Sequence, residues 1–265
     1  MPEGPEVRLT IDFLQKNLEN KIIKQWTFCG GKYTDEYPVG YSEFDKFLPA
    51  KILNILCKGK FIYFTLYNNT TNEYFYILHS LMLTGRWQNY YDDHCKCFIE
   101  LYNDKTIWFR DTRSFATFSF TNNLNILQTK LDKLGPDIMT KYFTLVYFKN
   151  IISKHPNRNI TSFLMDQNLL SGVGNYIKAE VLFYSKLSPL RKLKEINEEE
   201  IELLYEGLII IPRISYNFQG VTLKDFADEN GNYSKNKLKI YGHKNAKKTK
   251  TPDGRTTYWD PSVQN

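Results

Sequence analysis

The chain of 265 residues is 42% hydrophobic and 15% aromatic, so it can bury a sizeable core as one large domain or as two smaller ones. Its formal net charge of +6 permits an anionic partner but is too small to establish one. No apolar run is long enough to cross a bilayer and the N-terminus lacks the apolar core of a signal peptide, so we expect a soluble intracellular protein.

The first six residues can place a reactive amine beside two carboxylates. If the initiator methionine is removed, Pro2 exposes a secondary amine, and because an α-amino pKa lies near about 8, part of it is nucleophilic at neutral pH. Glu3 and Glu6 lie close enough in sequence to donate or accept protons there. The same residues also suit an ordinary helix entry, with Pro5 in the first turn and Glu6 at the positive helix end.

The first half of the chain reads as one helix followed by short strands. Apolar residues recur at helical spacing behind Pro5 as far as Leu18 and predict a helix of about four turns. Short apolar runs separated by Gly and Asn turns then indicate a β-sandwich closed on this helix. The predicted strands span residues 22–28, 52–56, 61–67, 74–78, 97–102 and 106–109.

Three loops in this half carry side chains suited to DNA. The Lys58-Gly59-Lys60 turn can aim an ammonium at a phosphate, although such turns are common on protein surfaces. The apolar tip Leu81-Met82-Leu83 and the stretch from Arg110 to Phe115 combine apolar, cationic and aromatic groups. Such side chains can fill the gap left when a nucleotide is drawn out of a duplex, but they could equally be strand ends that pack inward.

The second half is predicted to be a separate, mostly helical domain. Gly135-Pro136 interrupts regular structure, and helical periodicity replaces strand-like periodicity beyond it. We expect helices at residues 141–153, 160–166, 175–184 and 197–219.

A turn containing two glycines precedes the third of these helices. Gly172-Val173-Gly174 allows a tight turn whose backbone N–H groups meet the N-terminus of the helix, which is a ready anion site. Asn175 would bind a phosphate oxygen or, as commonly happens, simply cap the helix.

The C-terminal tail mixes lysines with aromatic residues. A run of charge is usually a solvated face, but residues 238–241 and 256–259 read as two strands around a loop. Arg255 then follows a Pro252-Asp253-Gly254 turn, where a β-ribbon could offer it to a phosphate.

Together these residues resemble the Fpg/Nei family of DNA glycosylase/AP lyases, especially its endonuclease VIII (Nei-like) branch, over nearly the whole chain. The most specific match runs from Leu164 to Glu180 and looks like the family's helix-two-turns-helix signature, and residues 220–226 are similar to the approach to its finger. The other matching stretches are Pro2-Glu3-Gly4-Pro5-Glu6, Lys58-Gly59-Lys60, Asp111-Thr112-Arg113-Ser114-Phe115 and Leu134-Gly135-Pro136.

The resemblance implies an α+β fold with two domains and a finger. It assigns residues 1–136 to an N-terminal β-sandwich catalytic domain with an N-terminal helix, residues 137–224 to a helix-two-turns-helix DNA-binding domain, and residues 225–265 to a β-hairpin finger. Pro2 would be the Schiff-base nucleophile that attacks C1′, with Glu3 and Glu6 managing protons at the sugar and the base. The DNA contacts would come from Lys60, Gly174, Asn175 and Arg255 at the phosphates and from Leu83, Arg113 and Phe115 in the void left by the everted base.

Two positions depart from the family pattern in that void. Leu83 stands where the family commonly has methionine, and Ser114 replaces an arginine often seen there. The second departure puts in doubt how the opposite strand is contacted, and with it any preference for the opposing base.

The finger departs from the family in its metal ligands. Most members close it with four cysteines, whereas this chain has no cysteine after Cys97, and His243 is the only histidine beyond His155. A tetrahedral zinc site cannot be built from these ligands, so the segment resembles the zincless finger of some Nei-like proteins. We therefore expect no metal and no cofactor.

The expected function is removal of oxidised bases, chiefly oxidised pyrimidines and hydantoins, followed by β,δ-elimination at the resulting site. The partner would be damaged DNA, duplex or single-stranded, with no membrane, and the protein would be a monomer in the nucleus or the cytoplasm. One alternative is a non-catalytic protein that binds damaged or single-stranded DNA. A tautomerase using a terminal proline as its base fits the amine alone and leaves the phosphate-binding elements without a purpose.

Overall fold

The computed structural model describes residues 2–221 and 238–265, which form two compact units. The first unit holds Pro2 and Glu6–Asp132, and the second holds residues 3–5, 133–221 and 238–265. Of the stretch 220–226, only Gly220 and Val221 are described. The loops at 227–235 and the expected boundary between residues 224 and 225 lie outside the described residues.

The N-terminal helix forms as the periodicity predicts. Helix α1 spans Gly4–Leu18, with Pro5 and the acidic Glu6 in its first turn. Its apolar positions Val7, Ile11, Leu14 and Leu18 are all buried in the core of the first unit.

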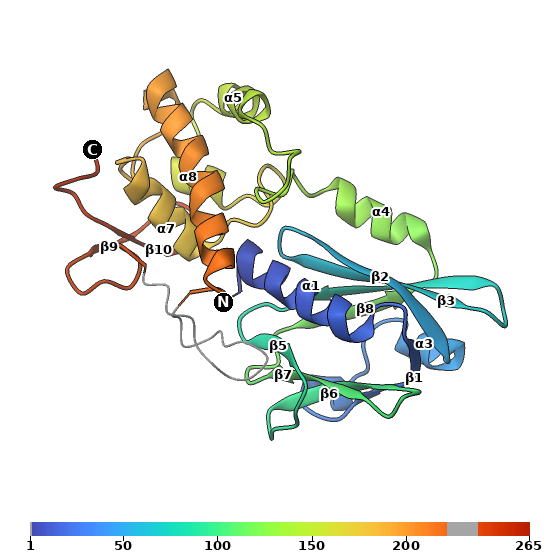
Figure 1. The fold of residues 1–265 in the computed structure, drawn as a ribbon. Helices are drawn as coiled ribbons and strands as arrows, with labels where there is room; N and C mark the ends of the chain where they lie inside the picture. The colour runs from blue at the N-terminus through green and yellow to red at the C-terminus, as the bar shows by residue number, and fades with distance from the viewer. Residues whose placement is uncertain (1, 222–237) are drawn as a thin grey trace. The chain divides into compact units, whose positions relative to one another are not determined.

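The first unit is built around an eight-stranded antiparallel sheet with the order β5-β7-β6-β1-β2-β3-β4-β8. The sheet folds back on itself, with β2, β3 and β8 in one layer and β5, β6 and β7 in the other (Figure 1). This confirms the predicted α+β architecture with an N-terminal β-sandwich. The strands are β1 (Ile22–Phe28), β2 (Ala50–Lys58), β3 (Phe61–Asn68), β4 (Glu73–Ser80), β5 (Gly85–Gln88), β6 (Cys95–Leu101), β7 (Thr106–Asp111) and β8 (Thr117–Thr121).

Aromatic rings fill the interior of the sandwich. Trp26 is fully buried, and five other rings meet it edge-on at centroid distances of 5.6–6.0 Å. Such edge-to-face pairs add to the free energy gained from burial alone. They are Phe44, Phe64, Trp87, Phe118 and Phe120.

Several short elements of the first unit were not predicted. Strands β5 and β8 have only four and five residues, too few for a period of two to stand out. Three short helices, α2 (Lys32–Asp35), α3 (Tyr41–Phe47) and α4 (Leu124–Asp132), also escaped prediction.

The second unit is mostly helical, as predicted, and its helix ends are set by capping residues. Helix α5 (Leu145–Ser153) starts after Thr144, which accepts a hydrogen bond from the Tyr147 N–H, rather than at residue 141. Helix α8 (Glu198–Asn217) starts at a capping box between Asn197 and Glu200. The remaining helical segments are α6 (Ile160–Leu164), α7 (Asn175–Tyr184) and the 3₁₀ turn η1 (Leu193–Glu195).

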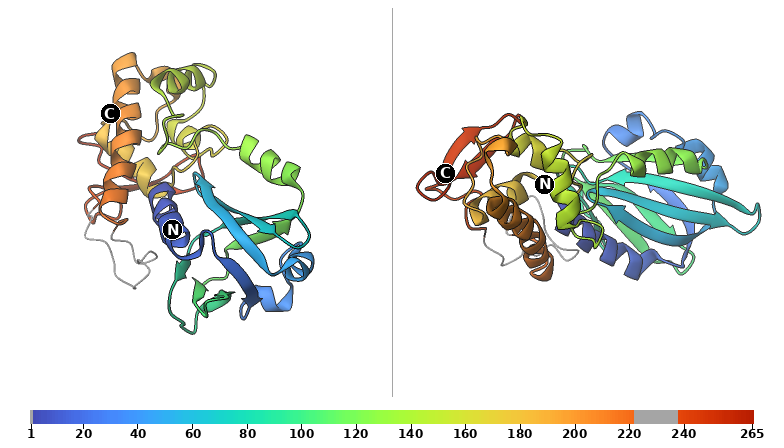
Figure 2. Two further views of the ribbon diagram at one scale, coloured as in Figure 1. Left: turned by 45° about the vertical axis from the view of Figure 1, so that its right-hand side comes forward. Right: turned by 90° about the horizontal axis from the view of Figure 1, so that it is seen from above.

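A two-stranded ribbon follows, coloured red in Figures 1 and 2, and corrects one expectation. Strands β9 (Lys247–Lys250) and β10 (Thr256–Trp259) pair antiparallel, so the second predicted strand is right and the first is wrong. Residues 238–241 form no strand, because the Glu180 carboxylate accepts the backbone N–H groups of Lys239, Ile240 and Tyr241 at 2.8–2.9 Å. No helix among the described residues is long and apolar enough to cross a membrane.

Candidate active site

Glu3 binds the N-terminal end of helix α7. Its carboxylate, only 2% exposed, accepts the Tyr176 N–H at 2.9 Å and the Ile177 N–H at 3.1 Å. These N–H groups have no partner within the helix, and the positive end of the helix dipole favours a carboxylate there. Glu3 therefore caps a helix that lies more than 170 residues away in the chain.

The glycine turn before α7 makes room for this carboxylate. A β-carbon on Gly174 would lie 2.1 Å from Cδ of Glu3, and Gly172, at φ +104°, accepts the Gly4 N–H at 3.0 Å. Gln167 braces the turn by donating to the Val173 carbonyl at 2.9 Å and accepting from the Gly172 N–H at 3.1 Å. The helix end that the sequence offered to an external phosphate is thus occupied by the chain's own carboxylate.

The position of Pro2 follows from that of Glu3. The two residues are joined by one peptide bond, so the Pro2 Cα lies about 3.8 Å from that of Glu3. Pro2 is buried, and so is Glu6 in the first turn of α1.

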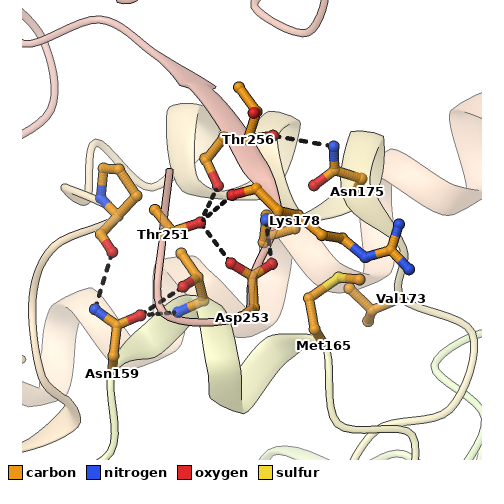
Figure 3. Close-up of polar contacts among 12 residues, drawn as sticks. Asn159, Met165, Val173, Asn175, Lys178, Thr251, Asp253 and Thr256 are labelled. Carbon is orange, nitrogen blue, oxygen red and sulfur yellow. Dashed lines mark hydrogen bonds and ion pairs between the residues drawn. The ribbon is translucent and has the colours of Figure 1, made fainter. Parts of the chain in front are cut away.

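Asn175 and Arg255 lie at neighbouring points of the second unit. Asn175 is the first residue of α7, and its Nδ2 donates to the Thr256 carbonyl at 3.1 Å (Figure 3). Arg255, the residue before Thr256, is exposed. Asn175 Oδ1 is buried and accepts no hydrogen bond from the described residues. The structure thus brings Glu3, Gly174, Asn175 and Arg255 together at one end of α7.

A buried ion pair holds the turn that carries Arg255. Lys178 Nζ lies 2.6 Å from Asp253 Oδ2, and the two side chains are 0% and 2% exposed (Figure 3). Burial lowers the pKa of Lys178, whereas the hydrogen bond to Asp253 opposes that shift. Burial by itself raises the pKa of Asp253, but hydrogen bonds from Lys178 and Thr251 outweigh it and lower that pKa.

Lys60 lies in the first unit, in the turn that joins β2 to β3. Lys58 pairs with Phe61 across the ladder, so Gly59 and Lys60 form a two-residue turn. Gly59 has φ +58°, as the first central position of a type II′ hairpin turn requires. Lys58, the residue before this turn, donates to the Leu131 carbonyl at 2.8 Å.

The residues expected to fill the gap left by the everted base lie on two segments that are both bound by the carboxylate of Asp111. This side chain is 0% exposed. Its carboxylate accepts the hydroxyl of Thr84 and the N–H groups of Arg113, at 3.3 Å, and Ala116, at 2.8 Å. This links the Leu81–Thr84 tip to the loop after β7. On that loop Arg113 and Phe115 are exposed, Phe115 by 50%.

The apolar tip itself differs from the expectation. Leu83 is only partly exposed, whereas its neighbour Met82 is 47% exposed and has φ +54°. The more accessible apolar side chain of this tip is therefore a methionine one position earlier than the residue chosen from the sequence.

Sequence reasoning missed the residues that hold the site in place. Asp111, Glu180 and Asp253 entered the sequence analysis only as members of matching stretches or of a turn, and Lys178 was given no role either, because a charged residue on a helix or turn is usually solvated. One signal was available for Lys178: it stands between Ile177 and Ala179 on a helix whose other residues are largely apolar.

The ribbon does not fit a zinc ion. Cys29, Cys57, Cys95 and Cys97 are all free thiols of the first unit. Within residues 2–221 and 238–265, no group of three or more His, Cys, Asp or Glu side chains could hold a metal ion. Asp253, the acidic residue of the turn, is paired with Lys178 instead.

The chain matches known proteins along its whole length. A family model described as the formamidopyrimidine-DNA glycosylase N-terminal domain matches residues 1–118, and the formamidopyrimidine-DNA glycosylase H2TH domain matches residues 134–226. A formamidopyrimidine-DNA glycosylase of Prochlorococcus marinus is 30% identical over 98% of each chain.

Solved structures share the fold. The MutM (Fpg) protein of Thermus thermophilus superposes with a TM-score of 0.83 at 22% identity, over 99% of this chain and 98% of that one. Wild-type Fpg of Lactococcus lactis, in complex with DNA containing N7-benzyl-Fapy-dG, gives a TM-score of 0.82 at 22% identity over the whole of both chains. The chain therefore belongs to the formamidopyrimidine-DNA glycosylase family of base excision repair, whose enzymes are DNA glycosylases with AP lyase activity.

Proposed function

We propose that this protein excises oxidised bases through a Schiff base formed by Pro2 after removal of Met1, and then cleaves the DNA strand by β,δ-elimination. The observation that carries the proposal is the seating of Glu3 on the end of α7 that also bears Asn175, beside the turn of Arg255. The proposed amine of Pro2 would be one residue from Glu3, whose carboxylate binds the helix that bears Asn175.

The chemistry begins at the sugar. The lone pair of the Pro2 nitrogen attacks C1′, the base leaves with the electrons of the glycosidic bond, and it takes up a proton. Opening of the sugar ring gives an iminium, which acidifies the hydrogen on C2′. Loss of that proton expels the 3′ phosphate, a second elimination expels the 5′ phosphate, and water finally releases the amine. Glu3 and Glu6 are proposed to carry the protons of these steps.

Catalysis depends on alignment of C1′ with the amine. Lys60, Asn175 and Arg255 are proposed to hold the phosphates flanking the lesion, so that binding energy is converted into orientation. Two features support this role: Arg255 is exposed, and Asn175 places its amide beside the Arg255 turn by donating to the Thr256 carbonyl at 3.1 Å.

The everted nucleotide leaves a gap that the first unit is proposed to fill. Arg113 and Phe115 are exposed on a loop fixed by Asp111, which suits side chains that insert into a base stack. Leu83 remains a candidate for the same role, with the more exposed Met82 beside it.

The proposed division of labour follows the sequence assignment. Residues 1–136 would carry the amine and the void-filling loop, residues 137–224 would bind DNA through the helix-two-turns-helix, and residues 225–265 would form a zincless finger. The enzyme would act as a monomer wherever the genome is kept. The finger proposal is supported by the absence of cysteine after Cys97 and by a ribbon turn held through Lys178 and Asp253.

For the substrate we propose oxidised pyrimidines and hydantoins, as the Nei-like resemblance and the metal-free ribbon suggest. A second candidate is a formamidopyrimidine lesion, which is favoured by the names of the relatives. Cleavage rates on single-lesion oligonucleotides, duplex and single-stranded, decide between them. A faster rate on formamidopyrimidine than on thymine glycol or hydantoin would make the formamidopyrimidine lesion the preferred substrate.

Borohydride trapping tests the nucleophile. Reduction of the iminium should yield a covalent protein–DNA adduct attached at Pro2, and mass spectrometry of the same sample should show that Met1 is missing. We expect Pro2→Gly to trap at least tenfold less, because proline's secondary amine forms the iminium directly. The control is Pro5→Ala, which also removes a proline of this segment and should trap normally. Full competence of protein that retains Met1 would contradict the mechanism and favour the non-catalytic DNA-binding alternative.

A further inference from the structure

The strongest unexplained feature of the second unit is a lysine with no access to solvent. Lys178 is 0% exposed on α7, one turn beyond Asn175, and its ammonium meets a carboxylate that is itself 2% exposed. Taking both charges out of water is costly, so a buried pair contributes little net stability compared with two apolar side chains. The pair is therefore better explained by what it fixes than by how much it stabilises.

What it fixes is the main chain of the Arg255 turn. The Asp253 carboxylate that meets Lys178 also accepts the Thr251 hydroxyl. Thr251 in turn donates its N–H to the Arg255 carbonyl at 3.0 Å, and its Oγ1, whose one hydrogen goes to Asp253, lies 3.0 Å from the same carbonyl. Gly254, at φ +78°, donates to the Thr251 carbonyl at 2.9 Å and lets the chain reverse. The carbonyl of Arg255 is thus connected to Lys178 through two side chains.

Helix α7 holds the turn on both sides of Arg255. Lys178 binds Asp253, two residues before it, and Asn175 donates to the carbonyl of Thr256, the residue after it. The ribbon has only four residue pairs of its own, and an isolated two-stranded ribbon is marginally stable in water. Its contacts with α7 must therefore set the direction of Arg255.

We infer that Lys178 and Asp253 are positioning residues for DNA binding: through the Thr251 network they fix the turn so that Arg255 and Asn175 act as one phosphate-binding unit. This inference rests on the proposed function, because it takes Arg255 as a phosphate ligand. The two charges of the pair cancel, which leaves Arg255 as the other charged residue of the turn from Thr251 to Arg255.

The test compares four variants of the mature full-length protein by their affinity for a duplex with a stable abasic-site analogue and by their melting temperature. Arg255→Ala should weaken binding at least tenfold without lowering the melting temperature. Lys178→Met with Asp253→Leu replaces the ion pair by apolar side chains, which keeps the fold. This double variant should melt near the wild-type temperature yet bind about as weakly as Arg255→Ala. Adding Arg255→Ala to it should weaken binding by less than a further twofold, because both act through one contact.

The matched control is Lys149→Met, which removes a lysine from a surface ion pair with Glu198 and Glu202 and should change affinity less than twofold. Wild-type affinity in the double variant, with Arg255→Ala still weak, would overturn the positioning role and leave the phosphate role intact. Wild-type affinity in Arg255→Ala would instead overturn the phosphate role itself. If the double variant melts well below wild type, Thr251→Val supplies the comparison, because it removes the hydroxyl that joins Asp253 to the Arg255 carbonyl and keeps the ion pair: wild-type affinity there contradicts the inference.

Discussion

Two turns carry the cations proposed to hold phosphates, and they are built in opposite ways. The Lys60 turn closes a hairpin of two long strands, seven residue pairs deep, so the ladder and the positive φ of Gly59 determine its shape. The Arg255 turn closes a ribbon of four pairs and is held by a buried ion pair and a threonine. Backbone pairing suffices in the first case, whereas the second needs side chains from a neighbouring helix.

The difference predicts where each turn is vulnerable. A turn fixed by its ladder tolerates side-chain changes within the turn itself, because the backbone hydrogen bonds remain. A turn fixed by a buried charge pair does not, because removing one partner leaves the other charge uncompensated away from water.

The largest expected effect is therefore on stability. Asp253→Ala should lower the free energy of unfolding by about 3–5 kcal/mol, because it strands the buried Lys178 ammonium. Lys60→Ala, the corresponding change in the other turn, should lower it by only about 1 kcal/mol, because the β2–β3 ladder remains paired. Urea unfolding followed by tryptophan fluorescence measures both. Equal losses for the two variants would show that the turns are not held differently.

The second expected effect is a loss of stability at low pH, which should affect the first unit before the Arg255 turn. His79, on the strand that pairs with β3, is buried, and burial lowers its pKa to about 3. The unfolded chain binds a proton at this residue below about pH 6.5 while the folded chain does not, so stability falls as pH drops from about 6.5 towards 3. The folding equilibrium constant should fall roughly tenfold per pH unit in that window. His79→Gln should flatten the dependence, and an unchanged slope would exclude His79 as its source.

The contribution of Asp253 to stability is lost at a lower pH than that of His79. Its pKa is lowered on folding, so its contribution to stability is complete above the ordinary aspartate pKa of about 3.9 and is lost only as pH falls through the lower folded value. Between pH 7 and pH 5 the Arg255 turn should therefore keep its ion pair while the first unit is already losing stability.

The smallest expected effect concerns salt. Lys60→Ala and Arg255→Ala should each reduce the slope of log binding constant against log salt concentration by about one, since each removes one phosphate contact. Phe115→Ala should weaken binding to lesion DNA without changing the slope, because the ring carries no charge. Fluorescence anisotropy at several salt concentrations gives all three slopes. If only one of these two lysine or arginine substitutions reduces the slope, only the turn that carries that residue binds phosphate.

The same contrast explains how much could be predicted from the sequence. Helix α1, strand β1 and helix α7 carry regular apolar patterns, and their expected bounds agree with the structure to within a few residues. Strand β9 is Lys-Lys-Thr-Lys, which has no apolar period, and it is a strand because it pairs with β10. Residues 238–241 alternate apolar and polar like a strand, yet a glutamate carboxylate takes three of their N–H groups.

The residues of the candidate site also differ in whether the sequence could predict them. Pro2, Asn175 and Arg255 stand in short stretches with a recognisable chemistry, so sequence and resemblance could single them out. Lys178, Asp253 and Asp111 act through burial and through partners distant in the chain, which no local pattern contains. The residues proposed to meet the ligand could be predicted from the sequence, and the residues that hold them in place could not.

Helix α7 is ten residues long, yet it gathers three remote parts of the polypeptide. Its first turn binds Glu3, Lys178 binds the ribbon turn, and Glu180 binds the backbone of residues 239–241. Because successive residues of a helix are rotated by about 100°, inserting or deleting a single residue within α7 would swing these attachments to different faces at once. The helix can accept substitutions of its exposed side chains, but its length cannot change without displacing the three segments that bind to it.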